Sequence, residues 1–269
     1  MFFGKVVGGL LGITLGGPIG AIVGVALGHF FDRGLSKFRP ELSAEDRAHA
    51  EQVFFSSVFQ LMGHVAKADG RVSEQEVARA EEIMAHMQLS TAMRAKAIEY
   101  FKKGGQTDFD LPGVVGEFNS IGNKLPSLRQ TLLTYLINIA LADGQIDDAE
   151  EECLGQISEH LGVSKFAFKQ LMAMLRAQAQ FYQQQQRHGS QPYTPSKDEL
   201  ALAYESLGVA SDASDPVVKK AYRKLMSENH PDKLQGQGVP QEMIEMATER
   251  AQKIQAAYDL IKKYRKTQS

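Results

Sequence analysis

The chain has 269 residues, enough for two modest domains with attached segments. Hydrophobic residues make up 43% and charged residues 23% of it, and the net charge of -2 gives no reason to expect nucleic-acid binding. The single cysteine, Cys153, excludes an intramolecular disulfide and fits a reducing compartment. We interpret Cys153 as a small packed residue rather than a nucleophile, and we expect no bound cofactor.

An uncharged segment of 23 residues runs from Val6 to Gly28. As a helix it would be about 35 Å long, which exceeds the ~30 Å hydrocarbon core of a bilayer. We therefore predict a single transmembrane helix at residues 6–28, after a short extracytoplasmic N-terminus at residues 1–5. The rival interpretation is a cleaved signal peptide, but the apolar run is longer than the usual signal core.

The juxtamembrane segment, residues 29–45, carries the positive charges that follow the membrane helix. Arg33, Lys37 and Arg39 lie on this side, and only Lys5 precedes the helix. Positive charge favours the cytoplasmic side of a membrane. We therefore predict a single-pass membrane protein whose C-terminal domains are cytoplasmic.

Glycine recurs at every fourth position of the membrane segment. Small residues at this spacing let two helices approach closely in lipid. The stripe drifts around the helix by about 40° per step, so one partner can contact only three or four of the glycines. We predict a homodimer formed through some of the following residues: Gly8, Gly12, Gly16, Gly20 and Gly24.

Residues 46–176 have the hydrophobic spacing of a helical domain. Ser43 followed by Asp46 is typical of a helix start. Residues 131–142 are apolar on nearly every side, which predicts a helix buried at the centre of the domain. The sequence Lys-Lys-Gly-Gly at 102–105 predicts a helix end, with basic residues in the last turn.

Two stretches of this domain match each other at an offset of 74 residues. Residues 66–76 and 140–150 both contain Ala-x-Ala-Asp-Gly followed by an acidic helix start. We interpret them as a duplicated helix–turn–helix unit in which glycine makes the turn and Ser73 or Asp147 caps the next helix. An EF-hand calcium loop would need oxygen ligands that at least two positions of each copy lack, so we do not expect one.

The duplicated Ala-Asp-Gly turn with its acidic helix resembles the TerB-type domain of tellurite resistance proteins. That resemblance implies a helical fold over roughly residues 50–175. Because the family includes metal-binding members, weak metal-ligand candidates follow from it: Asp69, Glu76, Asp143 and Glu150. We prefer the alternative, in which the aspartates close turns and the glutamates lie on solvated faces.

Residues 177–197 change in composition to a glutamine run followed by Gly, Ser, Pro and Thr. Such a segment cannot build a core and predicts a flexible, Gln-rich linker, with helix allowed at its start. Residues 198–269 then show three helical patterns. The first ends at Gly208, the second begins at Asp215-Pro216, and the third buries a stripe that includes Ala251, Ile254 and Tyr258. We expect the last two to pack as an antiparallel pair.

Between these two helices lies the sequence His230-Pro231-Asp232. Proline fixes its own φ and disfavours helix at the preceding residue, so it predicts a stiff corner that ends the second helix. Four elements in order resemble a DnaJ-type J domain: Tyr-Glu-Ser-Leu-Gly-Val at 204–209, the helix around Arg223, this tripeptide, and Lys-Ile-Gln-Ala-Ala-Tyr-Asp-Leu at 253–260. The fold class expected for the whole chain is all-α: a membrane helix, a TerB-like domain with an internal duplication and a J-domain hairpin.

That resemblance implies a co-chaperone, which stimulates ATP hydrolysis by a cytoplasmic DnaK-type chaperone and does no bond chemistry of its own. The order of the three parts is similar to a family of membrane-anchored DnaJ-like proteins. That similarity implies a location in the bacterial inner membrane and suggests a link to envelope stress or signalling. The residues expected to bind the partner are the corner and the basic face of the preceding helix: His230, Pro231, Asp232, Lys219, Lys220, Arg223, Lys224 and Lys233. The face would steer association and Asp232 would bind a partner arginine.

Two other functions compete with this one. An enzyme using His230, Asp232 and Cys153 is disfavoured, because no nucleophile or oxyanion motif accompanies the histidine. A membrane-linked metal or stress sensor is the alternative, with the TerB-like domain as its input. The sensor does not exclude the co-chaperone, since the J domain would then be the output.

Overall fold

The computed structural model describes residues 43–70, 74–123, 125–141, 146–188 and 196–268. Within these ranges every regular element is a helix, and the predicted all-α fold class is confirmed. No helix in them combines the length and apolar character needed to cross a membrane. The predicted membrane segment at residues 6–28, with its glycines, lies outside the described residues.

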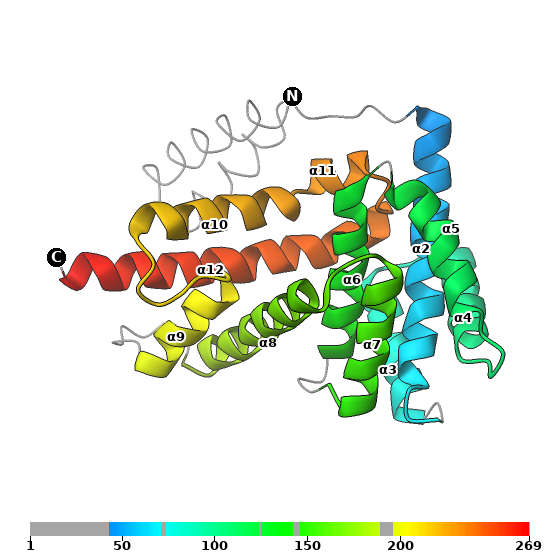
Figure 1. The fold of residues 1–269 in the computed structure, drawn as a ribbon, viewed down its shortest axis with the longest axis horizontal. Coiled ribbons are helices and arrows are strands. Elements are labelled where there is room, and N and C mark those ends of the chain that lie inside the picture. The colour runs from blue at the N-terminus through cyan, green and yellow to red at the C-terminus, as the bar shows by residue number, and fades with distance from the viewer. Residues whose placement is uncertain (1–42, 71–73, 124, 142–145, 189–195, 269) are drawn as a thin grey trace. The chain divides into compact units, whose positions relative to one another are not determined.

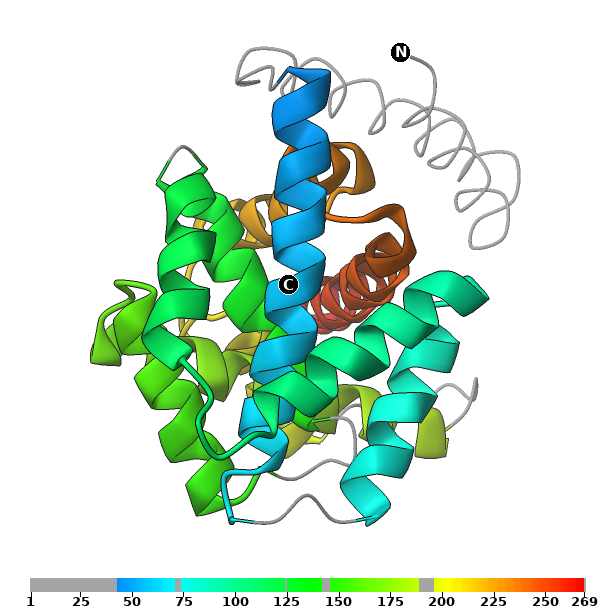
Figure 2. The same ribbon diagram turned by 90° about the vertical axis from the view of Figure 1, so that its right-hand side faces the viewer.

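The middle module comprises α2 to α7 and the first half of α8. Its helices are α2 (Ala44–Ala66), α3 (Glu74–His86), α4 (Thr91–Gly104), α5 (Leu111–Gly122), α6 (Pro126–Ala140), α7 (Asp148–His160) and α8 (Lys165–His188). Figure 2 shows α2 in the centre, with α4 on one side and α5 to α7 on the other. The predicted helix start after Ser43 and the helix end near residue 104 are both found.

The core of this module forms where α2 meets α5 and α6. The Phe54 ring packs 6.1 Å from the Phe118 ring and 5.7 Å, edge to face, from the Tyr135 ring. Along α6, Leu132, Leu133 and Ile137 are fully buried. Burial of large apolar side chains is the main stabilising contribution to such a domain. The all-round apolar pattern at 131–142 therefore correctly predicted a central helix.

Two glycines bring the backbones of α2 and α4 into direct contact. A Cβ atom on Gly63 would lie 2.0 Å from the Phe101 carbonyl oxygen, and one on Gly104 would lie 1.8 Å from the Gln60 carbonyl oxygen. No side chain fits at either position, because the obstacle in each case is backbone. Gly104 thus belongs to α4 and sets how closely α2 crosses it, a role beyond the helix end predicted from sequence.

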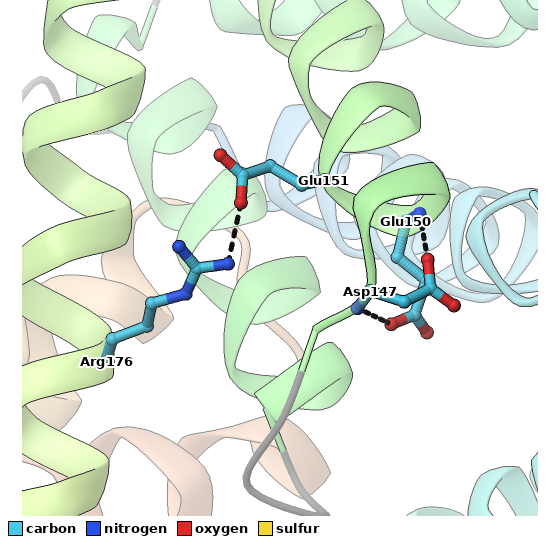
Figure 3. Close-up of polar contacts among 4 residues, drawn as sticks. All are labelled: Asp147, Glu150, Glu151 and Arg176. Atoms are coloured by element: carbon cyan, nitrogen blue, oxygen red, sulfur yellow. Dashed lines mark hydrogen bonds and ion pairs between the residues drawn. The ribbon is translucent and has the colours of Figure 1, made fainter.

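The second repeated turn leads into α7 through a reciprocal cap (Figure 3). The Asp147 carboxylate accepts a hydrogen bond from the Glu150 N–H at 2.8 Å, and the Glu150 carboxylate accepts one from the Asp147 N–H at 3.1 Å. This capping box confirms Asp147 as the predicted N-cap. The next residue, Glu151, forms an ion pair with Arg176 at 2.6 Å, which ties α7 to α8. In the first copy, Gly70 has a φ of 98°, as its turn requires.

The C-terminal module contains α9 (Lys197–Ser206), α10 (Asp215–Glu228), α11 (Pro231–Gly236), the short 3₁₀ helix η2 (Gln241–Met243) and α12 (Ile244–Gln268). In Figure 1, α10 and α12 lie side by side as the predicted hairpin. Val218 and Leu225 of α10 and Ile254 of α12 are buried. At the open end, Arg265 pairs with Asp215 and donates to the Tyr204 hydroxyl at 2.9 Å. These contacts stabilise the hairpin of α10 and α12 at the end opposite the His230-Pro231-Asp232 corner.

Helix α8 continues to His188, well into the segment predicted as a linker. Ala177, Gln178 and Phe181 are buried, and Lys253 of α12 lies 5.2 Å from the centre of the Tyr182 ring. The first part of residues 177–197 is therefore packed helix rather than a free tether, because its apolar side chains bury against the C-terminal module. Residues 189–195 lie outside the described part of the chain.

Candidate functional site

The His230-Pro231-Asp232 corner is built from the end of α10 and the start of α11. Asn229 closes α10, and its side-chain amide donates to the Leu225 carbonyl at 2.7 Å. His230 then turns extended, with φ −73° and ψ 127°, and Pro231 is the first residue of α11. Proline is favoured at this position because its missing N–H needs no helical partner. The predicted corner is present, but it leads into a helix that the sequence did not reveal.

His230 caps the helix that follows it. Its Nδ1 atom accepts a hydrogen bond from the Asp232 N–H at 3.2 Å. Because a backbone N–H can only donate, this bond requires the neutral ring to carry its proton on Nε2. His230 is therefore the N-cap of α11. The bond also couples the histidine ring to the backbone of the aspartate.

The corner is partly exposed. His230, Pro231, Asp232 and Lys233 all have intermediate exposure. In the part of the chain that the structure describes, the Asp232 carboxylate has no ion-pair partner. A carboxylate in this position can accept charge-assisted hydrogen bonds from a cation of another molecule.

The exposed face of α10 is basic, as the sequence predicted. Lys219, Lys220, Arg223 and Lys224 are all exposed. Only Lys224 has a nearby carboxylate among the described residues, that of Glu228 at 3.8 Å, and such surface pairs contribute little. A net positive surface therefore leads along α10 toward the corner.

A buried arginine behind the corner is the feature that the sequence pattern missed. Arg250 of α12 is only 9% exposed, and it donates to the Gln178 side chain at 3.3 Å and to the Asn229 side chain at 3.4 Å. The stripe predicted for α12 was largely correct, since Ile254 is fully buried. It differs at two positions, where Arg250 and Ala257 are buried and the predicted Ala251 and Tyr258 are half-buried. A helical spacing through Arg250 and Ala257 was also visible in the sequence, but it would have buried the charge of Arg250.

Two of the four weak metal-ligand candidates, Asp69 and Glu150, have side chains within the described residues. No group of three or more His, Cys, Asp or Glu side chains suited to a metal ion lies within that part of the chain. Glu150 belongs to the cap of α7. Asp143 and the side chain of Glu76 lie outside the described residues.

Cys153 is a packed thiol. It is 8% exposed, and its Sγ atom lies 3.9 Å from the His64 carbonyl oxygen. Burial, with a smaller contribution from the Glu150 carboxylate, raises the pKa of Cys153 to about 12. The thiol is therefore protonated at neutral pH and unsuited to nucleophilic attack, in agreement with the prediction from sequence.

Three protein-family models match the chain in order. They are the co-chaperone DjlA transmembrane domain at residues 1–38, tellurite resistance protein TerB at 56–173 and the DnaJ domain at 202–269. The first supports the membrane helix predicted at residues 6–28, and the other two support the middle and C-terminal helical modules. No solved structure gives a significant match.

Similar proteins cover nearly the whole chain. The co-chaperone protein DjlA of Coxiella burnetii is 39% identical over 269 residues, which is 98% of each chain. The DjlA proteins of Pasteurella multocida and Escherichia coli O157:H7 are 40% and 36% identical, each over 97% of both chains. Together with the domain order, this similarity shows that the chain belongs to the DjlA family of membrane-anchored, J-domain co-chaperones.

Proposed function

We propose that this chain stimulates ATP hydrolysis by a DnaK-type chaperone through the His230-Pro231-Asp232 corner. The observation that carries the proposal is the geometry of that corner. A proline holds the turn between two helices, and the Asp232 carboxylate is partly exposed and without an ion-pair partner among the described residues. Because the corner is already stiff, it loses little conformational entropy when it binds a partner.

The chain acts as a regulator in this proposal and not as a catalyst. Docking would shift the chaperone toward its hydrolysis-competent arrangement, which requires only that the corner bind that arrangement more tightly. Asp232 would accept a charge-assisted bond from a partner arginine, and the basic face of α10 would lie against an acidic surface. The chaperone supplies the nucleotide site and the water.

The direct test is single-turnover ATP hydrolysis by a DnaK-type chaperone, with the full chain reconstituted in lipid vesicles and titrated in. We expect the hydrolysis rate to rise with the chain and to saturate. Empty vesicles are the control, and a rate that stays at the basal value throughout the titration would contradict the proposal.

The basic face should act mainly on association. Replacing Lys219 and Lys220 by Gln removes two exposed charges from α10 and should raise the concentration needed for half-maximal stimulation several-fold at low salt. The matched control replaces Lys262 and Lys263, two exposed lysines at the far end of α12, in the same way. We expect little change from that control. Equal effects of the two variants, or an effect of the first that salt does not reduce, would argue against steering by α10.

We also propose that the chain crosses the bacterial inner membrane once and keeps both helical modules in the cytoplasm. The excess of Arg and Lys after residue 28 supports this orientation. A DnaK-type chaperone needs ATP, so the corner must face the compartment that contains it. Placement at the membrane suits a role in envelope stress or signalling.

A homodimer through the membrane helix is part of this proposal. Replacing Gly12 and Gly16 by Leu should reduce self-association in membranes, because close helix approach depends on small residues in register. Gly9 and Gly17, which lie outside the four-residue register, provide the control when changed to Leu. Crosslinking of full-length protein in vesicles measures the result, and undiminished crosslinking of the first variant would remove the pairing.

A further inference from the structure

The segment that leaves the corner is seated on the middle module. The Tyr135 hydroxyl of α6 donates to the Met243 carbonyl at 2.6 Å, in a buried position. Gly238, with a φ of 86°, lies so close to α2 that a Cβ atom built on it would be 2.5 Å from the Ala50 Cβ. Residues 231–243, here called the corner segment, are therefore held from two helices of the middle module.

A polar cavity separates α6 from the corner itself. Thr131, Thr134 and Tyr135 line it from α6, and Asn229, Lys233 and Arg250 line it from the C-terminal module. Its volume is about 60 Å³, room for a few water molecules. Polar side chains on both walls of the cavity can be bridged by water, in place of close apolar packing. Lys233, one of the residues predicted to bind the partner, faces this cavity.

The charge of Arg250, which lies behind the corner, also favours separation of the middle and C-terminal modules. Arg250 is buried, and in the described part of the chain its hydrogen-bond acceptors are the neutral oxygens of Gln178 and Asn229. Burial lowers the pKa of Arg250 to about 10, so it remains protonated at neutral pH. A buried cation whose hydrogen bonds go to neutral oxygens is costly, and the Glu228 carboxylate, which raises the pKa of Arg250, offsets only part of that cost. Separation of the modules would return water to Arg250.

From these contacts we propose that the middle module and the DnaK-type chaperone compete for the same corner. This inference rests on the proposed function and adds its regulation. In the arrangement described here, α6 covers the side of the corner that carries Asn229 and Lys233, whereas the basic face of α10 stays exposed. The chaperone first binds the exposed face of α10, and it contacts the whole corner only when α6 moves away. Anything that loosens the middle module from the corner segment therefore raises stimulation.

The first test is Tyr135→Phe in the full chain in vesicles. This change keeps the ring against Phe54 and removes the donor to the Met243 carbonyl. We expect about fivefold greater stimulation at subsaturating chain, because a single buried hydrogen bond is lost from the closed state only. Hydrogen exchange of the corner segment should accelerate by a similar factor. Tyr100→Phe on α4 is the matched control, since that hydroxyl has no hydrogen bond within the described residues.

A second pair of variants tests the direction of the effect. Thr131 lies on the α6 side of the cavity, opposite Lys233 and Arg250, with Glu228 as the one carboxylate of the lining. Thr131→Lys should repel the corner and increase stimulation, and Thr131→Glu should attract it and decrease stimulation. Both variants lose the same hydroxyl, which donates to the Ser127 carbonyl at 3.0 Å, so a folding defect would change stimulation in the same direction in both.

The outcomes separate this proposal from the proposed function. If the wild-type chain stimulates hydrolysis but Tyr135→Phe matches it in both stimulation and exchange, competition is overturned and the co-chaperone function stands. Lower stimulation by Tyr135→Phe, or a Thr131 pair that moves in one direction, would also overturn it. If no variant stimulates hydrolysis, the proposed function itself fails, whatever the exchange rates show.

Discussion

Replacing His230 by Gln is expected to reduce stimulation of the DnaK-type chaperone to the basal rate. The ring caps α11 through its bond from the Asp232 N–H, and this bond ties the ring to the aspartate that would bind the partner. The flexible side chain of glutamine does not hold such a cap in one geometry. Single-turnover ATP hydrolysis with the full chain in vesicles measures the loss.

The fold should survive this change. His230 is partly exposed, and a lost cap costs about 1 kcal/mol. Circular dichroism and the unfolding midpoint should therefore stay close to wild type. Gln235→Ala, an exposed change on the same short helix, serves as the control and should stimulate normally. Normal stimulation by the His230 variant would refute the proposed role of the corner.

Replacing Gly104 by Ala is expected to lower the free energy of unfolding of the middle module by about 3 kcal/mol or more. The added methyl group would meet the Gln60 carbonyl oxygen at 1.8 Å, and a backbone obstacle cannot rotate away. Helices α2 and α4 would have to separate, which would loosen the packing along Gly63 as well. Urea unfolding followed by circular dichroism measures the change.

Gly116 in α5 provides the matched control. A Cβ atom there meets nothing within 4 Å. Gly116→Ala should stabilise the protein by about 0.5–1 kcal/mol, because glycine is less favourable than alanine inside a helix. If both alanine variants changed stability in the same direction, the close helix crossing would not be the reason for glycine at position 104.

Features encoded by neighbouring residues were predictable. The capping box at Asp147 and Glu150 needs only four residues of sequence, and the proline corner at Pro231 needs two. The buried helix around Leu132 follows from apolar residues on every side. In each case the interactions that produce the feature lie within one or two helical turns, so a short stretch of sequence is enough to predict it.

The C-terminal hairpin was predictable for a second reason. The apolar spacing of α10 and α12 gave the helices, and the order of four motifs gave their pairing. The phase of α12 was only partly right, because the predicted stripe passed through Ala251 and Tyr258 where the structure buries Arg250 and Ala257. Shifting these two positions by one residue leaves the helical spacing of apolar residues almost unchanged. The charge of Arg250 made its burial look unfavourable, so the sequence pattern favoured Ala251.

By itself, the sequence determined the helical class, the order of the three parts, the repeated turn and the corner with its basic helix, because each depends on local spacing or on a short motif. Only the tertiary structure decided that α8 runs into the glutamine-rich segment, that Gly104 sets a helix crossing and that α6 lies beside the corner. Each of these depends on residues far apart in the chain, such as Tyr135 and Met243, whose contact stabilises an arrangement that neither segment encodes alone.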